Sequence, residues 1–145
     1  MKSNRKFTRS LAHALIVTLS LDAFAARAAD FVVIVNKANT ASVDKDIVAK
    51  IYTGNMKLWG DGTAIVALDL PENDPIRANF CNEIIGKTIG NLKALWAQLV
   101  FSGKALPPKQ MASDDEVKKF VSANKGGIGY IKQSGVDDSI KVALK

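Results

Sequence analysis

Short runs of β-branched and apolar residues alternate with segments of helical periodicity along most of this chain. FVVIVN (31–36) and AIVALDL (64–70) have the profile of buried strands, and IGYI (128–131) and IKVAL (140–144) are two shorter ones. The segments between them repeat apolar residues every three or four positions, which is typical of helices that pack one face on a core. This alternation predicts an α/β fold, a three-layer α/β/α sandwich with about four strands and four helices.

Capping residues predict where the helices begin. The predicted starts are Ser42 as the cap of a helix from Val43, Asp74 as the cap of a helix with Pro75 at its first position, Asn91, and Ser113 with Glu116 as a capping box. The stretch SGKALPPKQM (102–111) contains two adjacent prolines and is predicted to be a loop.

The first 28 residues have the three-part pattern of a secretory signal peptide. Four cations precede a mostly apolar run, and Ala26-Arg27-Ala28 places small residues at positions −3 and −1 of a cleavage site. The apolar run is short for a membrane span and is interrupted by His13 and Asp22. We therefore predict a signal peptide over 1–28 and a single domain over 29–145, periplasmic or secreted, with no membrane span after cleavage. A retained N-terminal anchor is the alternative.

Composition excludes several classes of function. Removal of residues 1–28 takes five cations and one acid from a chain with 20 Lys and Arg and 14 Asp and Glu, which leaves a net charge of +2. This small charge argues against a nucleic-acid partner. His13 is the only histidine and Cys81 the only cysteine. The mature domain is therefore predicted to have no intrachain disulfide, no metal site, no cofactor and no enzyme activity of the Ser-His or Cys-His type.

Several short motifs follow one another in a fixed order. They are I-Y-T-G (51–54), L-W-G-D-G (58–62), R-x-x-F (77–80), W-x-x-x-V-F-S-G (96–103), P-P (107–108) and G-G-I-G-Y-I (126–131). In this order they resemble the phosphate ABC-transporter substrate-binding proteins. The resemblance implies the fold of type 2 periplasmic binding proteins, in which two α/β lobes hold an anion in the cleft between them. Residues 29–145 are less than half that size, so the resemblance implies a single lobe.

The family's phosphate loop has no counterpart here. That loop carries Arg, Asp and Ser-Gly-Thr at a helix start, whereas this chain reads LDLPENDPIRANF (68–80). Pro75 removes a backbone donor, and Asp74 places a carboxylate where an anion would dock. The remaining candidates for oxyanion binding in this segment are Arg77, Asn73 and Asn79.

A second group of candidates follows the first strand. Ligands of α/β proteins gather beyond the carboxyl ends of strands, and the loop after residue 35 supplies polar side chains there. The candidates are Asn36, Lys37, Asn39 and Thr40. A solvated loop without a ligand is the alternative.

Two aromatic residues allow opposite interpretations. Trp59, between two glycines, either packs over the ends of a helix and a strand or forms an interaction surface. Tyr130 either presents its hydroxyl at a cleft or is half-buried. The glycines of GGIGYI follow a helix and precede a strand, so they predict a helix end and tight turn rather than a nucleotide loop. Cys81 is predicted to be a buried, small apolar side chain.

These observations lead to two hypotheses. The first is an exported, non-enzymatic protein that resembles the substrate-binding component of a phosphate ABC transporter and reversibly binds a small oxyanion such as phosphate. Its partners would be the anion and an ABC permease. The alternative is a protein-interaction module that kept the fold but lost the ligand site. Its contact surface would be the Trp59 turn and the 102–111 loop, or it would form a homodimer.

Overall fold

A computed structural model of the chain describes residues 30–145. The predicted signal peptide (1–28), including His13, lies outside the described residues. No helix between residues 30 and 145 combines the length and the apolar character that a bilayer span requires. The elements in chain order are β1 (Phe31–Val35), α1 (Lys45–Tyr52), β2 (Val66–Asp69), α2 (Pro75–Phe80), the π-helical turn η1 (Cys81–Ile85), α3 (Ile89–Phe101), β3 (Lys109–Gln110), α4 (Asp114–Ala123), β4 (Gly127–Lys132), the 3-10 turn η2 (Gln133–Gly135) and β5 (Lys141–Leu144).

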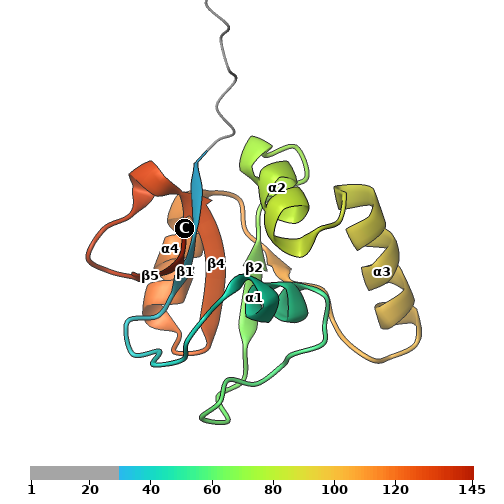
Figure 1. Ribbon diagram of the computed structural model, residues 1–145, viewed down its shortest axis with the longest axis horizontal. Coiled ribbons are helices and arrows are strands. Elements are labelled where there is room, and N and C mark those ends of the chain that lie inside the picture. The colour runs from blue at the N-terminus through green and yellow to red at the C-terminus, as the bar shows by residue number, and fades with distance from the viewer. Residues whose placement is uncertain (1–29) are drawn as a thin grey trace, which may run out of the picture.

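The five strands form one mixed sheet in the order β3-β2-β4-β1-β5 (Figure 1). β2 runs parallel to both of its neighbours, β3 and β4. β1 runs antiparallel to β4, with Val33 opposite Tyr130, and antiparallel to β5. The four predicted strands are confirmed, but the prediction that 102–111 is entirely loop is wrong. Its last residues form β3 because they pair with the end of β2, where the backbone N–H of Met111 donates to the carbonyl of Asp69 at 2.8 Å.

Helices cover both faces of this sheet. On one face, β4 has no side chain at Gly129, and a Cβ there would lie 2.5 Å from Val117 of α4. On the other face, the ring of Tyr130 stacks on Phe80 of α2, with ring centroids 3.9 Å apart. α3 joins this second layer through Trp96, whose Nε1 donates to the carbonyl of Tyr52 at the end of α1. The predicted three-layer α/β/α sandwich is therefore confirmed.

Two of the four predicted helix caps are observed. Asp74 caps α2 with Pro75 at its first position, and Ser113 caps α4 by accepting from the Glu116 N–H at 3.3 Å. The other two predictions are displaced. Asp44, not Ser42, caps α1, because its carboxylate accepts from the N–H of Ile47 at 2.8 Å. Thr88, not Asn91, caps α3, because its hydroxyl accepts the Asn91 N–H.

Trp59 and Tyr130 are both buried, which corrects their interpretation as an interaction surface. Trp59 is 4% exposed, and its Nε1 donates to the carbonyl of Gly126 at 3.2 Å. The short loop around it is closed by an isolated antiparallel bridge between Leu58 and Ala64. Tyr130 is fully buried beneath α1 and α2. Both rings stabilise the core, since a buried aromatic side chain contributes packing and a paired polar atom.

Cys81 is also buried, as predicted. Burial, with a smaller contribution from the charge of Asp69, raises the pKa of its thiol to about 11. The thiol is therefore protonated at neutral pH.

Candidate functional site

A buried polar network lies at the carboxyl end of β2. Asp69, the last residue of that strand, is 9% exposed and uses both carboxylate oxygens. Its Oδ2 pairs with Arg77 Nη2 at 2.8 Å, and its Oδ1 accepts from the hydroxyl of Tyr130 at 2.5 Å. Leu70 donates its backbone N–H to the same Oδ1 at 2.9 Å. Three elements, β2, α2 and β4, thus meet at one carboxylate.

This network neutralises the cation that the sequence offers as an anion ligand. Arg77 is 9% exposed, and its guanidinium is paired with Asp69. Burial first, and the charge of Asp69 second, raise the pKa of Tyr130 far above its ordinary value, so its hydroxyl stays protonated and donates. An incoming anion would have to displace a carboxylate that is already held by a guanidinium and a phenol.

The start of α2 also opposes an anion. The Asp74 carboxylate accepts from the N–H of Ile76 at 3.0 Å and occupies the position that an anion would take. Asn73 is exposed in the turn before the helix, and Asn79 is half-buried one turn into it. Neither asparagine forms a side-chain hydrogen bond with Arg77 among the described residues. Within residues 30–145 the Nε of Arg77 has no hydrogen-bond partner, so one buried donor stays unused here beside the Asp69–Arg77 ion pair.

The candidates after β1 lie at the opposite end of the sheet, because β1 runs antiparallel to β4. Asn36 has a structural role there: its Nδ2 donates to the carbonyls of Val121 and Ser122 in the last turn of α4. Lys37 is exposed and donates to the carbonyl of Asp138. The structure therefore does not bring these residues together with Arg77.

Asn39 and Thr40 line a small cavity with the Trp59 loop. This cavity, called the loop cavity below, has a volume of about 140 Å³ and is lined by Asn39, Thr40, Ala41, Trp59, Gly60, Asp61, Thr63 and Lys125. Asn39 is 5% exposed. Its Oδ1 accepts from the N–H of Ala41, whereas its Nδ2 has no hydrogen-bond partner among residues 30–145. A buried amide donor without a partner is uncommon and indicates a place where an acceptor would be stabilised.

An ion pair forms part of the wall of the loop cavity. Asp61 Oδ2 lies 2.9 Å from Lys125 Nζ, and Asp61 Oδ1 accepts the N–H of Thr63. The hydrogen bond from Lys125, followed by that from Thr63, lowers the pKa of Asp61, so it is ionised at neutral pH. The lining of the cavity thus includes a cation, a carboxylate and an amide donor.

Sequence reasoning missed Asp61, Thr63 and Lys125 as neighbours of Asn39. They lie in a turn and after a helix, where polar residues are ordinary, and no spacing in the sequence joins them. Asp69 does leave a signal in the sequence, because a carboxylate at the end of a buried strand requires a charged or hydrogen-bonding partner. Among residues 30–145, no group of three or more His, Cys, Asp or Glu side chains could hold a metal ion.

A separate apolar groove lies between α1, the start of β2 and the loop after α3. It has a volume of about 430 Å³, and its lining includes Met56, Val66, Trp96, Leu106 and Pro107. Leu106 of this lining is 81% exposed, and Phe101, the last residue of α3, is 95% exposed. Large apolar side chains exposed together on a small domain indicate a contact surface.

No protein-family model and no curated protein sequence matches the chain. Solved structures do. An ABC-type phosphate transport receptor from Vibrio cholerae superposes with a TM-score of 0.61 and 18% identity over 78% of this chain and 44% of the receptor. A putative phosphate ABC transporter substrate-binding protein with bound phosphate, from Clostridium perfringens, has a TM-score of 0.63 and 22% identity over 80% of this chain and 46% of its own. PstS from Borrelia burgdorferi has a TM-score of 0.55 and 16% identity over 72% of this chain and 40% of its own.

The chain shares its fold with phosphate transport receptors. The predicted resemblance to the phosphate ABC-transporter substrate-binding proteins is therefore confirmed at the level of the fold. The chain spans less than half the length of each of these proteins. The matched structures are transport proteins rather than enzymes.

Proposed function

We propose that this chain is a non-catalytic protein that reversibly binds a small oxyanion, and phosphate is the first oxyanion to test. It would serve a transport system, with an ABC permease as its partner. The fold shared with phosphate transport receptors supports the class of function. The observation that carries the site is the loop cavity, with the unpartnered amide donor of Asn39 in its lining.

The polar groups of the loop cavity suit a protonated oxyanion. Lys125 is paired with Asp61, but its side chain is 56% exposed, so it can turn toward an anion in a way that the buried Arg77 cannot. Asn39 and the hydroxyl of Thr40 supply hydrogen-bond donors. Asp61 is an acceptor only, because it is ionised. Phosphate at neutral pH retains a proton that it can donate to Asp61, whereas sulfate has none. The cavity therefore favours phosphate over sulfate.

Isothermal titration of the purified protein with phosphate, and with sulfate in parallel, tests this proposal. We expect saturable heat with phosphate and weaker binding of sulfate. Lys125→Ala should weaken phosphate binding about tenfold, because it removes a charge-assisted hydrogen bond. Asp61→Asn should reduce the preference for phosphate over sulfate. Lys93→Ala, which removes an exposed lysine paired with Glu72, serves as the matched control and should leave phosphate affinity unchanged.

Two results would contradict the loop cavity as the site. One is the absence of heat at millimolar phosphate. The other is a loss of affinity in Lys93→Ala equal to that in Lys125→Ala, which would indicate a general charge effect. The first result would favour the alternative function, a protein-interaction module that kept the fold but lost the ligand site. The observation that supports this alternative is the apolar groove, together with the exposure of Leu106 in its lining and of Phe101 at the end of α3.

We also propose that the protein is exported. Expression of the full chain, followed by cell fractionation and mass spectrometry, should recover a periplasmic or secreted species that begins at Ala29. A cytoplasmic, uncleaved product would contradict export, and a membrane-bound uncleaved product would show that residues 1–28 act as an anchor.

A further inference from the structure

The end of α3 and the loop after it expose a group of apolar side chains. Val100 is 47% exposed, Phe101 95% and Leu106 81%. The loop that carries Leu106 is linked to the start of the Trp59 loop by Lys57, whose Nζ donates to the carbonyl of Lys104 at 2.6 Å. Leu58, the residue after Lys57, is 56% exposed. These four exposed apolar residues, called the apolar cluster below, come from the end of α3, the loop after it and the neighbouring Trp59 loop, and they line neither the loop cavity nor the Asp69 network.

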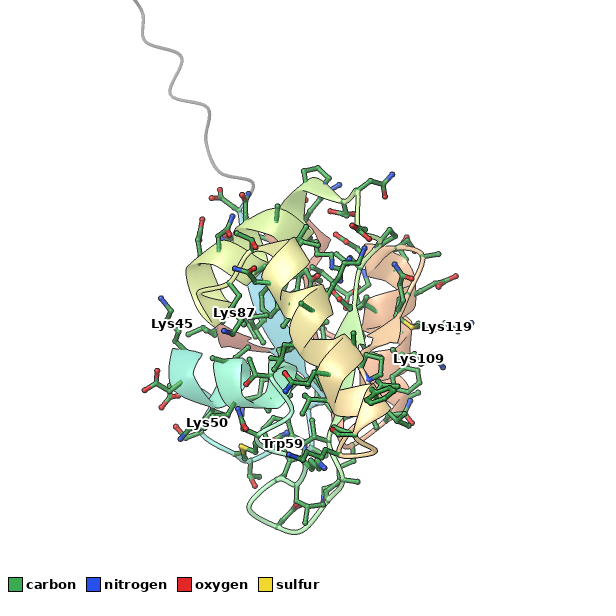
Figure 2. All side chains as sticks on the ribbon, turned by 90° about the vertical axis from the view of Figure 1, so that its right-hand side faces the viewer. Lys45, Lys50, Trp59, Lys87, Lys109 and Lys119 are labelled. Carbon is green, nitrogen blue, oxygen red and sulfur yellow. The ribbon has the colours of Figure 1, made fainter. Side chains whose placement is uncertain are left out.

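Cations surround the apolar cluster, and acids are absent from the segments that form it. Residues 47–60 and 84–113 contain Lys50, Lys57, Lys87, Lys93, Lys104 and Lys109 but no Asp or Glu. Figure 2 shows α3 from its exposed side, with Lys45, Lys50 and Lys87 along one flank and Lys109 and Lys119 along the other. Of the six lysines in these segments, only Lys93 forms an ion pair among the described residues. The other five lysines form no ion pair in this part of the chain and can act on an external partner, whereas Lys45 and Lys119 at the flanks lie close in sequence to Asp46 and Asp115.

We propose that this face docks on the surface of an anionic phospholipid bilayer. Exposed apolar side chains enter the boundary between headgroups and acyl chains, while lysines at their sides contact the phosphates. Anionic headgroups attract each such lysine, so the charge pattern and the apolar cluster act together. The proposal goes beyond oxyanion binding and does not depend on it.

A bilayer fits this face better than a second copy of the chain does. Two copies docked face to face would place lysines opposite lysines, which is unfavourable. A protein partner would need a pocket shaped for the projecting ring of Phe101 together with carboxylates placed for the flanking lysines. A bilayer provides a deformable apolar layer and anionic groups at once.

Vesicle flotation tests the proposal with the purified protein and its variants. The vesicles contain phosphatidylcholine alone or with about 30 mol% phosphatidylglycerol, the anionic component. We expect binding to the anionic vesicles, little binding to the neutral ones, and release when NaCl is raised to about 0.5 M. The double variant Phe101→Ser with Leu106→Ser should bind about tenfold more weakly, since it removes the two most exposed apolar side chains. Val136→Ser is the matched control, because Val136 is an exposed apolar residue (38%) in another part of the chain, and it should bind as the wild type does.

A second measurement locates the contact. Cys81 is buried, so a cysteine introduced by Ser102→Cys or by Ser134→Cys is the accessible thiol for an environment-sensitive dye. On anionic vesicles the dye at 102 should shift its emission to shorter wavelengths, and the dye at 134 should not. All variants share one N-terminus, so residues before 30 contribute equally to each comparison.

Any one of three results would overturn the proposal. They are a failure of the wild type to bind anionic vesicles, binding of the double variant equal to that of the wild type, and equal emission shifts of the dyes at 102 and 134. Because phosphate titration does not involve this face, its outcome is independent of these results.

Discussion

Replacement of Asp69 by alanine should lower the free energy of unfolding by about 3 kcal/mol or more, because it leaves the guanidinium of Arg77 buried without its partner. Asp69 and Arg77 are each 9% exposed and lie 2.8 Å apart. The same change removes the acceptor of the Tyr130 hydroxyl. Urea denaturation followed by circular dichroism measures the change in stability.

Two further variants show whether the buried charge is the cause. Glu72→Ala breaks an exposed pair with Lys93 and should lower stability by less than about 1 kcal/mol. Adding Arg77→Met to Asp69→Ala should restore part of the lost stability, since it removes the unpaired charge. If Asp69→Ala is no more destabilising than Glu72→Ala, the network does not hold β2, α2 and β4 together as described.

Gly126→Ala should destabilise the protein by about 2 kcal/mol or more, because a Cβ at this position would overlap the backbone carbonyl of Ala64. Backbone cannot rotate away as a flexible side chain can. The carbonyl of Gly126 also accepts from the N–H of Val66 at 3.0 Å and from Trp59 Nε1 at 3.2 Å. A shift of this residue would therefore disturb the start of β2 and the Trp59 loop together. Thermal unfolding measures the effect.

Gly60→Ala is the matched control for this prediction. Gly60 lies in the Trp59 loop, which is linked to Gly126 through the Trp59 Nε1 hydrogen bond, yet a Cβ there would meet no atom within 4 Å. We expect its stability to stay close to that of the wild type. Equal destabilisation by the two substitutions would show that loop flexibility, rather than overlap with Ala64, sets the effect.

Local features of the fold could be predicted from the sequence because their causes are local. Asp74 and Pro75 meet the requirements of a helix start by themselves, and so do Ser113 and Glu116. The errors at Ser42 and Asn91 arose where another capping residue, Asp44 or Thr88, lies within three positions. β3 could not be foreseen, because two residues carry no periodicity and form a strand only by pairing with β2.

The candidate site was less predictable because it depends on the direction of strands. The run FVVIVN fits a parallel or an antiparallel strand equally well. Since β1 is antiparallel to β4, Asn39 and Arg77 lie at opposite ends of the sheet. The sequence offers Arg77 as a candidate anion ligand, but its partner Asp69 comes from another element, and only tertiary structure brings the two together. The burial of Tyr130 has the same origin, since it is buried under α1 and α2.

The place of β1 in the sheet has a consequence for the order of synthesis. Phe31 pairs with Lys132, and Val33 lies opposite Leu144, so the first strand completes its hydrogen bonds only with segments made about a hundred residues later. While the ribosome adds those residues, β1 has neither neighbour, and the sheet cannot close. The emerging chain thus stays open until β4 and β5 have been made. A polypeptide that completes its sheet so late stays unfolded for most of its synthesis, and the export proposed above would use that unfolded state.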